Sequence, residues 1–188
     1  AGSSGGSLAL YDLRDPSPTT LALHRTHPAR IVGARIVNPG GVGVAAEPTH
    51  PGFLLATAAA NGELHLSDLR KPGEPIRRVE AHGSWMSRLA AHPLAPLLAT
   101  IGGCGSAKTE KDDEVGVVRV WSGDGSLLST VHAPAVSTAG SMAGGPAASL
   151  GPTCVAFHPR QLMLGIGLSN GSVTCLGCSM QQTTTGGS

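Results

Sequence analysis

The chain has 188 residues, of which 13% are charged, and its formal net charge is +1. This length suffices for one domain with a sizeable core, while the near-neutral balance argues against a nucleic-acid-binding protein, which needs clustered basic residues. No run of about 18 apolar residues is present, so the sequence predicts no membrane insertion.

The first part of the chain predicts short strands joined by turns. Residues 1–6 are rich in Gly and Ser and are expected to form a flexible lead-in. Residues 7–12 place Leu8 and Leu10 on one face, as in a half-buried strand. Further strands are expected at residues 19–24 and 29–37. We interpret residues 38–52 as a long insertion that runs over the surface.

A tight hairpin is predicted in the middle of this pattern. Residues 53–59 form a continuous run of small apolar side chains, which indicates a strand buried on both faces. Asn61-Gly62 follows, and both residues tolerate positive φ, so the dipeptide is a strong hairpin signal. The strand at 63–69 is therefore expected to turn back against residues 53–59.

The same order of elements recurs twice more along the chain. The second set of strands is expected at residues 75–79, 84–91, 97–101 and 115–122. The third set is expected at residues 126–131, 153–157, 162–168 and 172–176. Two more insertions, at 102–114 and 133–151, separate these strands, and residues 179–188 are expected to form a disordered tail.

One turn-strand pattern is repeated at near-constant spacing. Gly6-Ser-Leu-Ala-Leu-Tyr-Asp-Leu-Arg14 aligns without a gap with Gly62-Glu-Leu-His-Leu-Ser-Asp-Leu-Arg70, and weaker copies begin at Gly116 and Gly171. The spacings between the four glycines are 56, 54 and 55 residues. A period of this size indicates a repeat architecture.

The strands amount to one leading strand and three four-strand units, about 13 in total, with no sustained helical periodicity. Antiparallel four-stranded units of this kind are the blades of a β-propeller. We therefore expect an all-β fold, a partial propeller over residues 7–178, with repeat units at 7–70, 71–122 and 123–178. A β-sandwich is the structural alternative.

The repeats resemble those of the WD40 family. The family dipeptide at the end of the third blade strand is matched by Tyr11-Asp12 and Ser67-Asp68, and half matched by Trp121-Ser122. The Gly-His element before the first strand survives only as Ala81-His82. No repeat carries the complete His, Ser/Thr, Asp and Trp network of the family, but His82, Ser84 and Trp121 are candidates for part of it.

The order of segments is similar to that of the carboxy-terminal propeller of the Raptor family, the regulatory-associated subunits of TOR complex 1. The matching segments are 6–14, 61–70, Leu-Ala-Ala-His-Pro at 89–93, Gly-Asp-Gly-Ser-Leu-Leu at 123–128, Cys-Val-Ala-Phe-His-Pro at 154–159 and Leu-Gly-Ile-Gly-Leu-Ser-Asn at 164–170. Since the repeats account for only part of a closed ring, upstream blades are also expected.

This resemblance implies a non-catalytic scaffold or adaptor that presents substrates to the TOR kinase in nutrient and growth signalling. Its implied partners are a TOR-type kinase and other TOR complex 1 subunits, in the cytoplasm and at the lysosome or vacuole surface. Another WD40 scaffold, such as a ubiquitin-ligase substrate receptor, is the alternative, and a propeller enzyme is a third possibility.

Few residues suggest chemistry, and we predict no catalytic, cofactor or metal site. The four cysteines favour no disulfide framework and a reducing, intracellular setting. Cys175-x-x-Cys178 has metal-ligand spacing, but Cys175 falls in the inward-facing row, where a small buried thiol is expected. His92-Pro93 and His158-Pro159 recur after the first strand of a unit and indicate a turn device. His82 is interpreted as a structural hydrogen-bonding group.

Overall fold

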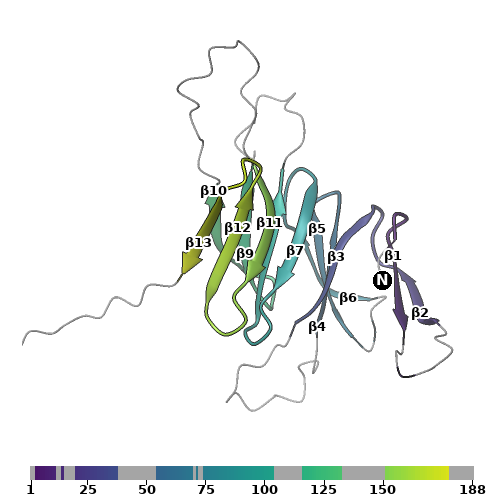
Figure 1. Ribbon diagram of the computed structural model, residues 1–188. Coiled ribbons are helices and arrows are strands. Elements are labelled where there is room, and N and C mark those ends of the chain that lie inside the picture. The colour runs from purple at the N-terminus through teal and green to yellow at the C-terminus, as the bar shows by residue number, and fades with distance from the viewer. Residues whose placement is uncertain are drawn as a thin grey trace, which may run out of the picture.

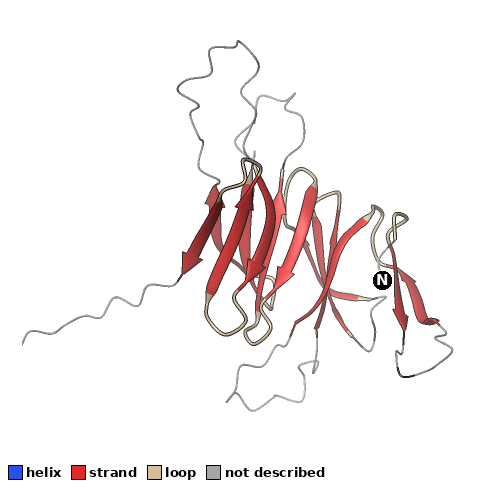
Figure 2. Ribbon diagram, viewed as in Figure 1, coloured by secondary structure: helices blue, strands red, loops and turns tan. Residues whose placement is uncertain are grey.

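The structure is a computed structural model that describes residues 3–11, 14, 20–37, 54–69, 71, 74–103, 116–132 and 151–177. Across these ranges it is an all-β protein (Figures 1 and 2). The strands are β1 Ser7–Tyr11, β2 Thr20–Arg25, β3 Ile31–Val37, β4 Leu54–Ala59, β5 Glu63–Asp68, β6 Pro75–Glu80, β7 Met86–Ala91, β8 Leu97–Gly102, β9 Val117–Ser122, β10 Leu127–His132, β11 Pro152–Phe157, β12 Met163–Leu168 and β13 Val173–Gly177.

The strands form four antiparallel sheets that follow one another along the molecule, from the purple β1–β2 pair to the yellow-green β11–β13 sheet (Figure 1). Their orders are β1-β2, β3-β4-β5-β6, β10-β9-β8-β7 and β11-β12-β13. Described residues include no helix long and apolar enough to cross a membrane. The arrangement is an open, partial propeller, and this part of the sequence prediction is confirmed.

The sheets are offset by one strand from the repeats in the sequence. The second and third sequence units each begin with a strand that pairs with the sheet before it, as β6 pairs with β5 and β10 pairs with β9. Blades therefore begin at β3, β7 and β11. The reason is that a short turn lets β6 fold back on β5 at once, while the next strand crosses to a new sheet.

The middle strands of the second and third sheets are buried because neighbouring sheets cover both of their faces. All six residues of β4 are buried, in agreement with the predicted two-sided strand. In β8, Leu98 packs into the core between the second and third sheets, while Ala99 and Ile101 face the core between the third and fourth. Leu64 and Leu66 of β5 lie in the first of these cores, facing the neighbouring blade as expected.

The four repeated glycines have one backbone conformation. Gly6, Gly62, Gly116 and Gly171 have φ angles of 76°, 90°, 81° and 84°, a region that suits glycine because it has no Cβ. The predicted hairpin at Asn61-Gly62 forms, and its amide at Gly62 donates to the Ala59 carbonyl oxygen. Asn61 itself does not adopt a positive φ, so only the glycine needs the left-handed conformation.

The last sheet has one face that no described residue covers. Val173 and Cys175 of β13 stand at the positions that Leu64 and Leu66 hold in β5, yet Val173 is 71% exposed and Cys175 is exposed. The prediction of a buried thiol at Cys175 is therefore wrong. The inward-facing row is buried only where another sheet follows.

Several sequence predictions fall outside the described residues. They are the insertion at 38–52, most of the insertions at 102–114 and 133–151, the tail at 179–188, Asp12 and Cys178.

Candidate functional site

A chain of hydrogen bonds lies inside the third sheet. Trp121 of β9 donates its indole N–H to Thr100 Oγ1 of β8 at 2.9 Å, and His82 Nε2 lies 2.9 Å from the same oxygen. All three side chains are buried. A threonine hydroxyl both accepts and donates, so the indole can donate to Thr100 and the hydroxyl can donate to a neutral imidazole.

The electrostatics of His82 agree with this direction of donation. Burial, together with the nearby Arg119 guanidinium, lowers the pKa of His82 to about 4. The imidazole is therefore neutral at neutral pH and has a ring nitrogen free to accept. This arrangement links the β6–β7 connection to β8 and β9, which is a structural role.

The second sheet contains a partial copy of this chain. His27 Nε2, from the connection between β2 and β3, lies 2.9 Å from Thr57 Oγ1 of β4. Ser67 occupies the position of Trp121, so the indole donor is missing.

Sequence reasoning missed His27, Thr57 and Thr100 as members of these networks. The available signal was the segment Leu-Leu-Ala-Thr, which occurs at 54–57 and again at 97–100. Ser84 was expected in the network, but its buried hydroxyl has no hydrogen-bond partner among the described residues. Thr100 supplies the hydroxyl of the network instead, because its strand β8 pairs directly with β9, the strand that carries Trp121.

The structure places His92 and His158 at equivalent turns. The Nδ1 atom of His92 accepts from the backbone amides of Leu94 and Ala95 at 3.1 and 2.9 Å. The Nδ1 atom of His158 accepts from the amides of Arg160 and Gln161 at 3.2 and 3.0 Å. Both imidazoles thus hold a tight turn after the first strand of a blade.

His92 also connects two blades. Its Nε2 atom lies 3.1 Å from the Gln161 carbonyl oxygen in the next turn, and its ring contacts Phe157 edge-on. The other predicted residues, Tyr11 and Asp68, lie at the ends of β1 and β5, where Tyr11 is 45% exposed and Asp68 is half-buried. The structure does not bring Tyr11 and Asp68 into the networks described above.

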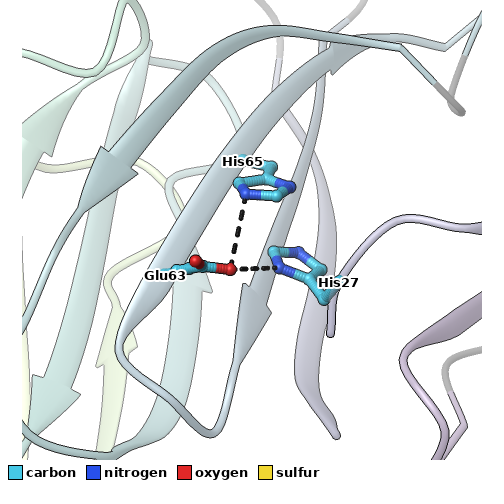
Figure 3. A group of neighbouring side chains, drawn as sticks. All are labelled: His27, Glu63 and His65. Atoms are coloured by element: carbon cyan, nitrogen blue, oxygen red, sulfur yellow. Dashed lines mark ion pairs between the residues drawn. The ribbon is translucent and has the colours of Figure 1, made fainter. Parts of the chain in front are cut away.

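A further cluster, His27, Glu63 and His65, was not anticipated from the sequence (Figure 3). Glu63 Oε2 lies 3.6 Å from His27 Nδ1 and 3.7 Å from His65 Nε2. The two imidazoles are stacked, with centroids 3.9 Å apart and an interplanar angle of 20°. The sequence does contain one indication of this cluster, the pattern Glu-x-His at residues 63–65. Residues two apart in a strand project from the same face, so this pattern makes Glu63 and His65 neighbours.

The cluster is largely shielded from solvent and opens at one side. Both imidazoles are buried, whereas the Glu63 side chain is 37% exposed. Burial lowers the pKa of His27, and burial with His27 and Arg78 nearby lowers the pKa of His65 to about 4. Burial alone would raise the pKa of Glu63, but the Asn61 side chain and the two imidazoles hold it below its usual range.

Comparisons with known proteins agree with this architecture. No protein-family model matches the chain. Regulatory-associated protein of TOR 1 from Arabidopsis thaliana is 29% identical over 176 residues, which cover 93% of this chain and 11% of that protein. The chain thus spans about a tenth of the length of that relative.

Two solved structures share the fold. Raptor from Chaetomium thermophilum has a TM-score of 0.66 at 17% identity, covering 94% of this chain and 14% of that one. Sqt1 from Chaetomium thermophilum, bound to the N-terminus of the ribosomal protein L10, has a TM-score of 0.60 at 18% identity, covering 93% of this chain and 41% of that one.

The fold and the repeated His-Thr pairs define the class of this chain, which is a WD40-type β-propeller present as an open, partial stack of blades. Within that class the chain resembles Raptor, the regulatory-associated protein of TOR.

Proposed function

We propose that the chain is a non-catalytic scaffold for protein–protein contacts, acting as the propeller of a Raptor-like subunit of a TOR complex 1. The observation that carries this proposal is the 29% identity to regulatory-associated protein of TOR 1, which extends over 176 residues. Its partners would be a TOR-type kinase and the other subunits of that complex, and its task would be to help present substrates to the kinase.

The internal chemistry of the blades supports a scaffold. His82, Thr100 and Trp121 bond to one another, and His92 and His158 bond to turn amides, so these polar groups are used to hold the frame. Sqt1, which shares the fold, holds the N-terminus of a ribosomal protein. Sqt1 is therefore a precedent for a propeller of this fold that binds a segment of another protein.

A candidate contact surface lies on two adjacent turns. Leu94, in the β7–β8 turn, is 63% exposed, and Leu162, in the β11–β12 turn, is 56% exposed. The hydrogen bond from His92 to the Gln161 carbonyl places these turns side by side. Neighbouring exposed apolar side chains on loops are typical of partner-binding surfaces.

Affinity purification of the tagged intact protein, followed by mass spectrometry, tests the proposal. We expect recovery of a TOR-type kinase with its complex partners, and weaker recovery from the double variant Leu94→Lys with Leu162→Lys. The matched control is Leu127→Lys with Leu128→Lys, since these residues are 50% and 56% exposed and belong to β10 and not to either turn.

Reproducible absence of the kinase would contradict the TOR assignment, and recovery of a ubiquitin ligase in its place would favour a different WD40 scaffold. Equal recovery by both double variants would reject the two turns as the contact surface.

A further inference from the structure

The second sheet carries metal-ligating side chains where the other sheets do not. Glu63 and His65 stand one and three residues after the repeated glycine Gly62. The corresponding pairs in the other repeats are Ser7 and Ala9, Val117 and Arg119, and Ser172 and Thr174. The WD40 frame therefore does not require a carboxylate and an imidazole at these positions, and another cause for them is needed.

Direct hydrogen bonds do not account for the cluster. The separations of 3.6 and 3.7 Å between Glu63 Oε2 and the two imidazole nitrogens exceed the range of a hydrogen bond. His27 Nδ1 and Glu63 Oε2, which face each other, are buried and have no hydrogen-bond partner among the described residues. Buried polar atoms that face each other without a direct hydrogen bond are found where an ion or water completes the site.

We propose that His27, Glu63 and His65 bind a divalent transition metal ion, with Zn²⁺ as the best match. Imidazole nitrogen and carboxylate oxygen are both ligands of Zn²⁺, at about 2.0–2.2 Å. Tetrahedral bonds of that length separate neighbouring ligand atoms by about 3.3 Å. The three donor atoms already lie within 4.8 Å of one another, so small side-chain rotations bring them to this spacing. The stacked rings require such a rotation, which the broad torsion between Cβ and the imidazole permits.

The surroundings of His27 fit a metal ligand. A ligating histidine usually donates its other ring N–H to an oxygen, and His27 Nε2 faces Thr57 Oγ1 at 2.9 Å. Thr57 Oγ1 can accept this bond, and no indole N–H competes for it because Ser67 stands where the other blade has Trp121.

Charge at the opening is mixed. A surface depression of about 270 Å³ beside the cluster is lined by Asn61, Glu63, His65, Arg78, Val79 and Glu80. Glu63 pairs with Glu80 directly across β5 and β6, and two carboxylates so placed repel each other unless a cation lies nearby. Arg78, opposite His65, supplies some positive charge, so it competes with the metal for these carboxylates. The bound ion would fix the β2–β3 connection to β5.

Metal titration of the intact, chelator-treated chain tests the proposal. We expect one Zn²⁺ per chain by calorimetry, a rise in the unfolding temperature on adding Zn²⁺, and a visible absorption band of four-coordinate Co²⁺. His65→Arg and Glu63→Val introduce the residues that the next blade carries, so the frame should hold them. Each should weaken Zn²⁺ binding by about tenfold or more and remove the Co²⁺ band.

The control is His132→Gln, which removes an exposed imidazole on β10 and should leave binding unchanged. Circular dichroism without metal checks that each variant is folded, and Glu63→Gln, which keeps the shape of the side chain, replaces any variant that is not. No Zn²⁺ binding by the parent chain would overturn the proposal. Binding that survives both His65→Arg and Glu63→Val would overturn it as well.

Discussion

At the scale of single residues, the chain uses buried threonines as the meeting points of its polar networks. Thr100 receives the Trp121 N–H and lies against His82, whereas Thr57 lies against His27 alone. A buried donor or acceptor that loses its partner costs about 1–3 kcal/mol. Thr100 therefore satisfies two buried side chains and Thr57 satisfies one, so the loss of Thr100 should cost more stability.

Replacing these residues by the isosteric valine tests the difference. Thr100→Val leaves both an indole and an imidazole nitrogen without a partner, and we expect a loss of about 2–4 kcal/mol in the free energy of unfolding. Thr57→Val affects one imidazole and should cost about 1–2 kcal/mol. Urea denaturation measures both. Equal losses would show that the Trp121 bond contributes nothing.

At the scale of elements, the repeated glycine turn determines how each blade meets the strand before it. A Cβ at Gly62 would lie 2.1 Å from the His82 carbonyl oxygen and 2.5 Å from that of Ser84. Gly171 has nearly the same φ, but nothing lies within 4 Å of its Cβ position among the described residues. Both glycines thus have the left-handed backbone conformation, but only Gly62 has neighbouring atoms where a Cβ would lie.

This pair separates backbone strain from steric overlap. Gly171→Ala should cost about 1–2 kcal/mol, the ordinary cost of a left-handed L-residue. Gly62→Ala must in addition displace the His82 backbone, so we expect a loss of about 3 kcal/mol or more. Thermal unfolding, with each variant compared to the parent chain, gives the two values. A similar loss in both variants would refute the overlap.

Among the elements, those set by neighbouring residues could be predicted from the sequence, and those set by distant residues could not. The hairpin at Asn61-Gly62 and the buried strand before it could be predicted, because turn chemistry and apolar runs are local properties. The offset between sequence repeats and sheets could not, because it depends on which neighbour a strand pairs with. The His27, Glu63 and His65 cluster was hidden for the same reason, since His27 comes from a different sheet connection.

At the scale of the whole molecule, each sheet is stabilised by the next. Val118 of β9 is 1% exposed because the fourth sheet covers it, and it shares a core with Leu164 and Ile166. Val173, the equivalent residue of β13, is 71% exposed. The same position in the repeat is therefore core in one blade and surface in the last.

Truncation of these two valines measures that dependence. Val118→Ala should lower the free energy of unfolding by about 1–3 kcal/mol, because it removes buried methyl groups and leaves a cavity. Val173→Ala should change it by no more than about 0.5 kcal/mol in the isolated chain. Chemical denaturation of both variants gives the comparison. A large loss at Val173 would mean that another surface covers β13 in solution.

Local patterns in the sequence were enough to predict the strands and turns, because apolar alternation and left-handed glycines act within a few residues of one another. The repeat could be predicted as well, because it copies one such local pattern along the chain. It also carried the resemblance to WD40 proteins and to Raptor. Three features became known from the folded chain alone: which strands share a sheet, the exposure of Cys175, and the contact of Thr100, in place of Ser84, with His82 and Trp121. Those outcomes depend on contacts between sheets, which arise from segments far apart in the chain.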